Sequence, residues 1–391
     1  MINKPTIVVV AFNRVHSLSR LLNSLITSKL EADTRLIISI DYSGDNSVEN
    51  YAEAFDWSFG EKIVVTHKKN LGLRKHVLQC GDLSQKYGSI ILLEDDLVVS
   101  PMFYQYTKKA LNHYEENDAV GGISLYNHKY NVNAKQTFEP LIDGYDNYWL
   151  QFASSWGQAW TAKQWQLFRE WYGSTAVALL DSDAIPQNVV NWPESSWLKY
   201  YIKYLVVTNR YFIYPRESLT TNFSDLGTHV TKRDYTYQVS LSLSKQNFNF
   251  STLTESNAIY DVFFEIEPAI IKKFNKALAS IDFEVDLYGT KKISNINREF
   301  TLSSKKFIGN SILSFSRELK PHDLNIISNF SSDENHVFNI TASKSFISTK
   351  NWESKKSDNE YYFYSLPIKS LIGILIERLK YKTKTLLNKK K

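Results

Sequence analysis

Three consecutive carboxylates, Glu94, Asp95 and Asp96, follow the apolar run 90–93. Carboxylates this close repel one another and raise one another's pKa unless a cation holds them. Because neither Cys nor His accompanies the run, its oxygen atoms favour Mg²⁺ or Mn²⁺ over zinc. The run therefore predicts a divalent metal site that would neutralise the diphosphate of a nucleotide-linked substrate. The alternative is a solvated acidic turn at the end of a strand.

Two other polar positions end apolar runs in the same way. Asn13 and Arg14 follow the β-branched run 6–12, and Asp41 follows the apolar run 36–40. Ligands of parallel sheets collect at the carboxyl ends of the strands. We therefore expect these side chains and the carboxylate run to converge on one crevice.

The elements that must position these side chains alternate between strand and helix patterns. Strands are predicted at 6–12, 36–40, 62–66, 89–93 and 120–125, and helices at 18–26, 72–86 and 101–114. Such a series predicts the α/β class, with a mostly parallel sheet flanked by helices. No G-x-G-x-x-G follows the first strand and no G-x-x-x-x-G-K-[ST] occurs. This argues against a dinucleotide oxidoreductase and a P-loop NTPase.

Segments 5–14, 40–41, 70–72 and 92–101 resemble the GT-A glycosyltransferases. The groups that they resemble are the bacterial surface-polysaccharide glycosyltransferases and the Golgi alpha-mannoside beta-N-acetylglucosaminyltransferases. The resemblance covers residues 5–235. It implies the GT-A (Rossmann-like) fold and a nucleotide diphosphate sugar as donor, with a UDP-sugar favoured.

The resemblance implies a role for each carboxylate of the run. Asp96 would ligate Mn²⁺ or Mg²⁺ directly. Glu94 and Asp95 would face the ribose and the sugar of the donor, with Asp95 counted in the catalytic set.

Further donor-binding residues are implied in the same way. Asn13 and Arg14 would contact the donor, Asp41 its base or ribose, and Arg74 would lie near it; His229 would bind the diphosphate or close over the metal. For Arg74 the alternative is a solvated helix start, and for His229 a buried structural histidine.

The general base does not follow directly from the resemblance. An inverting transfer needs a group that takes the proton of the acceptor hydroxyl. The family places an Asp after a Trp, whereas here Leu198 follows Trp197. Glu194, three residues before Trp197, is the substitute candidate for the base, with Asp181 and Asp183 as further candidates.

Tryptophan is concentrated in one segment, because seven of the nine lie between residues 149 and 197. Pyranose rings present apolar C–H faces that pack on aromatic planes. The segment 154–160 resembles the family's flexible loop over donor and acceptor, so we expect Trp156 and Trp160 to touch sugar. The other tryptophans are expected in the core.

Three parts are expected along the chain. Residues 1–238 would form the GT-A domain, 239–364 an accessory region of mixed short strands and helices, and 365–391 a basic amphipathic helix. Residues 369–391 carry eight basic residues and one acidic residue, Glu377, so their net charge is +7. Since the net charge of the whole chain is +5, the remaining residues carry −2. A basic amphipathic helix is typical of an interfacial membrane anchor. The alternative is a helix docked on the protein or on a partner.

Composition narrows the class further. The slightly acidic body is a poor surface for nucleic acid, whose binding needs phosphate neutralisation. Cys80 is the single cysteine, so no intramolecular disulfide requires an oxidising compartment. No run reaches the ~20 apolar residues that span a bilayer. These features predict a cytoplasmic protein, peripherally associated with the inner membrane.

Together these inferences predict a metal-dependent, inverting hexosyl- or N-acetylhexosaminyltransferase. Its acceptor would be a glycan or lipid-linked oligosaccharide in bacterial surface polysaccharide assembly, such as O-antigen or capsule. The alternatives are a non-catalytic sugar-binding or scaffold protein of the same fold, and a sugar-phosphate nucleotidylyltransferase. The second normally needs a Gly-rich, basic loop after the first strand, and segment 11–14 supplies neither feature well.

Overall fold

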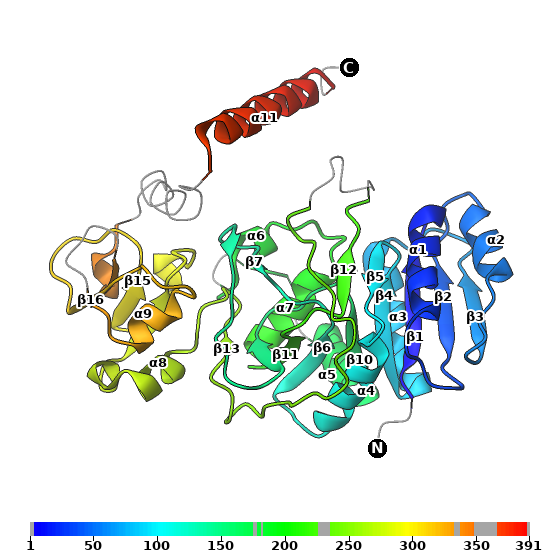
Figure 1. The fold of residues 1–391 in the computed structure, drawn as a ribbon, viewed down its shortest axis with the longest axis horizontal. Helices are drawn as coiled ribbons and strands as arrows, with labels where there is room; N and C mark the ends of the chain where they lie inside the picture. The colour runs from blue at the N-terminus through cyan, green and yellow to red at the C-terminus, as the bar shows by residue number, and fades with distance from the viewer. Residues whose placement is uncertain are drawn as a thin grey trace.

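The computed structural model describes residues 4–174, 178–180, 183–225, 235–331, 337–347 and 366–388. Its main feature is a nine-stranded sheet in the order β13-β9-β11-β6-β10-β4-β1-β2-β3 (Figure 1). The strands are β1 (Thr6–Ala11), β2 (Leu36–Ile40), β3 (Lys62–Thr66), β4 (Ser89–Glu94), β6 (Val120–Ser124), β9 (Asn147–Leu150), β10 (Gln158–Thr161), β11 (Tyr211–Pro215) and β13 (Ile259–Tyr260).

Helices connect the strands of this sheet. They are α1 (Val15–Ile26), α2 (Ser47–Ala54), α3 (Leu73–Tyr87), α4 (Phe103–His113), α5 (Ala162–Ser174), α6 (Gln187–Val190) and α7 (Leu198–Val207). Two small ribbons, β5 (Leu97–Val99) with β12 (Thr220–Asn222) and β7 (Tyr130–Asn131) with β8 (Gln136–Thr137), complete this part of the chain. The predicted α/β class and GT-A-like sheet are confirmed.

The hydrophobic pattern explains these elements. Every residue of β1 and β2 is buried, as expected for parallel strands covered on both faces. Helix α1 buries Leu18, Leu21, Leu22 and Leu25, the i, i+3, i+4, i+7 stripe of an amphipathic helix. Gly72 enters α3 with a φ of 75°, a conformation that glycine adopts without strain.

Strand directions define the edge of the sheet that matters for function. Strands β1, β2, β3 and β4 are parallel, and β10 runs antiparallel between β4 and β6. Strand β11 is parallel to β6, so β6 and β11 run in the same direction as β1. We call the edge where these strands end the carboxyl edge.

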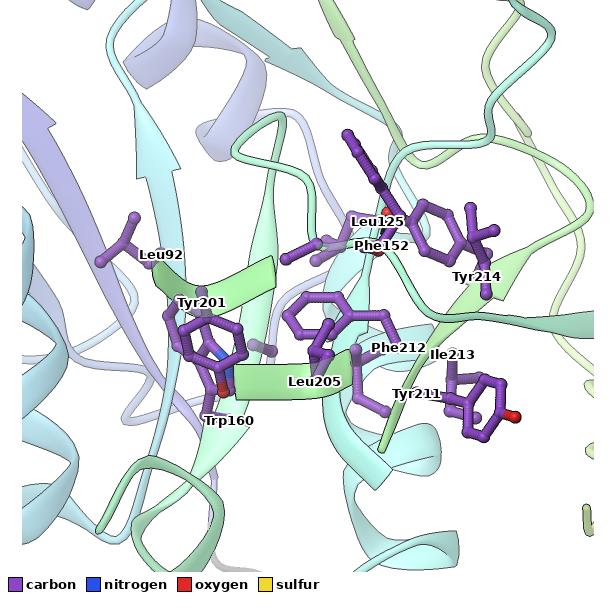
Figure 2. Close-up of a cluster of buried hydrophobic side chains, with 14 of the residues drawn as sticks. Leu92, Leu125, Phe152, Trp160, Tyr201, Leu205, Tyr211, Phe212, Ile213 and Tyr214 are labelled. Atoms are coloured by element: carbon purple, nitrogen blue, oxygen red, sulfur yellow. Dashed lines mark hydrogen bonds between the residues drawn. The ribbon is translucent and has the colours of Figure 1, made fainter. Parts of the chain in front are cut away.

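A buried aromatic cluster fills the layer between α5, α7 and the sheet (Figure 2). Trp160 on β10 is fully buried, with its ring centroid 4.8 Å from that of Trp165 and 5.8 Å from that of Tyr201. The expectation that Trp160 touches sugar is therefore wrong. Side chains alternate between the two faces of β10, and this alternation directs Trp160 into the core, where the helices cover it.

The remaining chain adds a second, smaller sheet in the order β14-β15-β17-β16. Its elements are α8 (Pro268–Phe274), η1 (Lys276–Leu278), β14 (Phe283–Asp286), η2 (Ile293–Asn295), β15 (Phe300–Ser303), β16 (Leu313–Phe315), α9 (Asp323–Ile327), β17 (Phe338–Ala342) and η3 (Ser343–Ser345). Since β13 pairs with β9, the large sheet extends beyond residue 238 to Tyr260.

The last described element is helix α11 (Ile368–Asn388). Its apolar side chains at 368, 371, 372, 374, 375, 376 and 379 are all exposed. No helix in the described ranges is both long and apolar enough to cross a membrane.

Candidate active site

The carboxylate run lies at the end of β4, where Arg14 reaches it from the end of β1. Nη1 of Arg14 lies 3.2 Å from Oδ2 of Asp96, and Nη2 donates a short hydrogen bond to Oδ1 of Asp95. The backbone N–H of Asp95 donates to the carbonyl of Val10, 3.1 Å away. This bond continues the β1–β4 pairing beyond Glu94. The parallel register thus brings Arg14 and the carboxylates together.

Among the described residues, the site has too little positive charge for its carboxylates. Burial, together with the neighbouring charges of Asp96 and Asp95, raises the pKa of Glu94 to about 8. Burial raises the pKa of Asp95 to about 6, although the Arg14 cation opposes this. One guanidinium therefore does not balance three partly desolvated carboxylates, and an additional cation would be stabilised here.

Two oxygen atoms beside the run are suited to a hard cation. Oδ1 of Asp96 and Oδ1 of Asn222 are both buried without a hydrogen-bond partner among the described residues. The two residues are close in space, because Asn222 on β12 pairs with Leu97, the residue after Asp96. Sequence reasoning missed Asn222, which becomes a neighbour of Asp96 only through this ribbon.

The described part of the chain contains no group of three or more His, Cys, Asp or Glu side chains arranged to hold a metal ion. Mg²⁺ characteristically takes only one or two carboxylates and completes its shell with water and substrate phosphates. Asp96, with a free buried oxygen, fits that pattern. The residues present thus fit a divalent ion whose other ligands come from a bound diphosphate and solvent.

Asp41, at the end of β2, is buried and organises the loop before α3. Its Oδ1 accepts hydrogen bonds from the backbone N–H groups of Tyr42 (2.9 Å) and Leu71 (2.8 Å), and its Oδ2 from that of Gly72 (3.0 Å). The carboxylate therefore fixes the start of α3. Through this loop it also fixes the position of Arg74 in the first turn of that helix.

Arg74 and Glu194 belong to one polar cluster, which joins the starts of α3 and α7. Nη1 of Arg74 donates to the hydroxyl of Tyr200 at 2.9 Å and lies 3.7 Å from Oε2 of Glu194. Tyr200 donates a short hydrogen bond to Glu194, and Nζ of Lys199 lies 2.5 Å from the other oxygen of that carboxylate. These hydrogen bonds, that of Lys199 first, lower the pKa of the largely exposed Glu194.

The loop 154–157 contacts the carboxylate run on one side and an aromatic group on the other. The side chains of Ser155 and Glu94 are hydrogen-bonded. The half-buried Trp156 packs against Tyr126, with ring centroids 4.6 Å apart, and against Tyr237 at 5.0 Å. Trp156 is therefore held beside the carboxylates at the carboxyl edge.

Sequence reasoning also missed His128, which lies 5.9 Å from Trp156 between ring centroids. Burial lowers the pKa of His128 to about 3, so its ring is neutral. The residue follows the carboxyl end of β6. It lies four residues beyond that strand, too far for the rule that selected Arg14 and Asp41.

The other predicted residues are placed as follows. Asn13 is exposed at the end of β1, and Asp183 pairs with Lys203 at 2.9 Å. His229 and Asp181 lie outside the described residues. Asp225 accepts a 2.6 Å hydrogen bond from Ser17 on α1 and pairs with Arg20. Its segment adjoins the site, since the N–H of Phe223 donates to the carbonyl of Asp96 at 3.0 Å.

This arrangement is a largely parallel sheet with a carboxylate run at the end of β4. Residues 6–161 match the model of glycosyl transferase family 2. Residues 6–161 are therefore similar to that family, within a sheet of the GT-A arrangement.

Solved structures of other proteins are similar over part of the chain. The mannosyltransferase PcManGT from Pyrobaculum calidifontis, in complex with GDP-Man and Mn2+, is 13% identical, with a TM-score of 0.31 over 43% of this chain and 47% of that one. S. aureus TarS 1-349 is 13% identical, with a TM-score of 0.34 over 55% of this chain and 59% of that one. The chain thus spans less than two thirds of the length of PcManGT and of TarS 1-349. No curated protein sequence matches the chain.

Proposed function

We propose that the protein is a metal-dependent, inverting glycosyltransferase that moves a hexosyl or N-acetylhexosaminyl group from a nucleotide diphosphate sugar, with UDP favoured, to a glycan or lipid-linked acceptor. One observation carries this proposal above the others. The run Glu94 to Asp96 shares a single cation, Arg14, and keeps the Oδ1 atom of Asp96 buried and unpartnered within the described chain. Such a site suits a divalent cation with a diphosphate.

The residues at the carboxyl edge divide the work of binding the donor. Asp41 holds the loop before α3, so that the nucleotide meets a preformed surface. Asp96 would hold Mn²⁺ or Mg²⁺, which when bound neutralises the charge that develops on the departing diphosphate. Arg14 keeps Asp95 and Asp96 in position, and Trp156 offers an aromatic plane to the sugar.

The transfer step needs one proton acceptor. The acceptor hydroxyl oxygen bonds to the anomeric carbon while the bond to the diphosphate oxygen breaks, and the hydroxyl proton must leave. Glu194 is our candidate to receive it, because its largely exposed carboxylate lies in the polar cluster with Arg74 at the starts of α3 and α7. Lys199 and Tyr200 orient that carboxylate. Within the described residues, the alternative proton acceptors are Asp183 and Asp225.

The proposed setting is the cytoplasmic face of the inner membrane, in the assembly of a bacterial surface polysaccharide such as O-antigen or capsule. Support comes from α11, whose apolar side chains are exposed and which carries basic residues such as Lys369, Arg378 and Lys380. A helix of this type binds in the interface of anionic membranes. There it would keep the active site close to a lipid-linked acceptor.

A second candidate function is a non-catalytic, sugar-binding protein of the same fold. The observation that favours it is the pairing of Glu194 with Lys199, because a carboxylate with a lowered pKa is a weaker base. Leu198 at the expected position of the base agrees with this reading.

Release of the nucleotide diphosphate from a panel of nucleotide sugars, with Mn²⁺ or with EDTA, tests the proposal. We expect Mn²⁺-dependent release from one donor, increased by an acceptor glycan. A sugar-binding protein would show a donor-dependent rise in melting temperature without release. A nucleotidylyltransferase would act only on a nucleoside triphosphate with a sugar phosphate.

A further inference from the structure

A second cleft lies at the opposite edge of the large sheet from the carboxylate run. Its volume is about 540 Å³, and it opens between the end of β13, the end of α7 and the accessory sheet. Strand β13 is parallel to β9, which is antiparallel to β11. The residue after β13, Asp261, therefore lies away from the carboxyl edge. The proposed transfer reaction leaves this cleft unused.

Charged side chains line the cleft in near balance: the acidic ones are Asp261, Glu267, Asp282 and Glu284, and the basic ones are Lys291, Lys292 and Arg298. Nζ of Lys291 lies 2.6 Å from Oδ2 of Asp261 and also pairs with Glu284. Arg298 pairs with Asp282, and its Nε lies 3.8 Å from Oε2 of Glu284. A nucleotide or another polyanion needs an excess of uncompensated positive charge. These ion pairs therefore favour a ligand without net charge.

The uncharged part of the lining supplies both hydrogen-bonding groups and apolar surface. The amides of Gln151 and Asn297 face the cleft together with Phe263, Val206 and Pro268. Carboxylates and amides arranged this way accept from and donate to hydroxyl groups. Phe263 beside them is largely buried, with Nζ of Lys291 5.3 Å from its ring centroid, so it adds only a small apolar surface. A volume of this size is also within the range of ligand-binding clefts.

We propose that this cleft binds a neutral oligosaccharide, in a second saccharide site separate from the reaction centre. The natural ligand would be a segment of the acceptor glycan away from the reacting hydroxyl. Only this identification of the ligand rests on the proposed function. Helix α7 connects the two regions: its first turn holds Tyr200 beside Glu194, and Val206 near its end lines the cleft. Its ten residues span about 15 Å. A glycan of several sugars is long enough to contact both.

Binding of neutral trisaccharides to the full chain, without donor or metal, tests this site directly. The probes are trisaccharides of glucose, galactose, mannose or N-acetylglucosamine, followed by saturation-transfer NMR and titration calorimetry. The blocking variant is Asn297→Trp, which fills the cleft from an exposed position, and the matched control is Asn50→Trp on the exposed face of α2. Melting temperatures establish that both variants are folded.

We expect at least one trisaccharide to bind the wild type, with a tenfold or greater loss of affinity in Asn297→Trp and no change in Asn50→Trp. The proposal is overturned if no trisaccharide binds or if Asn297→Trp binds as tightly as the wild type. It is also overturned if inorganic pyrophosphate, and no trisaccharide, binds in a way that Asn297→Trp abolishes.

The donor-release assay separates this result from the proposed function. Without acceptor, Asn297→Trp should release nucleotide diphosphate at the wild-type rate, because the cleft lies away from the carboxylate run. Saccharide binding without any donor release would sustain the second site while refuting the transferase. Donor release without saccharide binding would refute the second site alone.

Discussion

Nη1 of Arg14 lies 3.2 Å from Oδ2 of Asp96, although 82 positions separate the two residues in the sequence. The guanidinium acts as a permanent counter-charge at the end of β4 and also binds Asp95. It engages only one oxygen of Asp96 and leaves Oδ1 without a partner in the described chain. The pair therefore leaves one oxygen of the carboxylate able to bind a second cation.

Replacing Arg14 with Gln should make the fold more dependent on divalent metal. The variant leaves Asp95 and Asp96 without their cation, which should lower the free energy of unfolding by about 2 kcal/mol, allowing for partial exposure. Mn²⁺ should then raise the melting temperature of Arg14→Gln more than that of the wild type. Arg35→Gln, which removes an ion pair with the exposed Glu61, is the control. An equal response of wild type and Arg14→Gln to Mn²⁺ would contradict the prediction.

Replacing Asp96 with Asn should abolish Mn²⁺-dependent donor binding and lower the transfer rate by at least 10²-fold, an order of magnitude typical of a lost electrostatic stabiliser. The amide keeps the shape of the side chain, so the melting temperature should change little. Donor titration calorimetry with and without Mn²⁺ measures the effect, with Asp56→Asn on the exposed surface as control. Normal turnover of Asp96→Asn in EDTA would rule out the metal site.

Replacing Glu194 with Gln tests the base. We expect turnover to fall by ~10²–10⁴-fold, the usual contribution of a positioned general base, with little change in donor affinity. Steady-state kinetics with a fixed acceptor measure this, and Glu53→Gln, which is exposed on α2, is the control. Unchanged turnover would exclude Glu194 and direct the search to Asp183 and Asp225.

Deleting residues 366–391 should release the protein from anionic vesicles and leave transfer to a water-soluble acceptor unchanged. The exposed apolar side chains of α11 bury surface that salt does not screen, so high salt should weaken attachment only in part. Co-sedimentation with vesicles at low and high salt measures this. Equal sedimentation of the full and shortened chains would show that α11 does not anchor the protein.

The stability of the protein should fall in mild acid because of His76. This buried side chain lies 2.8 Å from the hydroxyl of Ser39, and burial lowers its pKa from 6.5 to about 4. Between those two values the unfolded chain binds the proton and the folded chain does not. The unfolding free energy therefore falls as pH drops from 6.5 to 4, by up to about 3 kcal/mol from this group.

Urea unfolding at several pH values checks this dependence. His76→Gln should flatten the curve between pH 4 and 6.5, the range between the two pKa values. His16→Gln changes an exposed side chain on α1 and should leave the curve as in the wild type. A slope that is identical in His76→Gln and the wild type would assign the acid sensitivity to other groups.

The sequence by itself determined the first half of the fold and the chemistry of its edge. The apolar runs that became β1, β2 and β4 are local patterns, and their burial on both faces follows from composition alone. Polar residues directly after such runs must lie at the carboxyl ends of the strands. Arg14, Asp41 and the carboxylate run could therefore be placed at one edge without a structure.

Tertiary structure decided what depends on contacts between distant segments. Trp160 looked like a sugar-contacting residue until the covering helices, with Trp165 and Tyr201, buried it. Glu194 is largely exposed, and its pKa is lowered by hydrogen bonds from Lys199 and Tyr200 and by the charge of Arg74 on the distant helix α3. The second cleft likewise exists because β13 joins the large sheet and brings Asp261 to Lys291. Side-chain pairing and burial across the fold set these properties, and no local pattern records them.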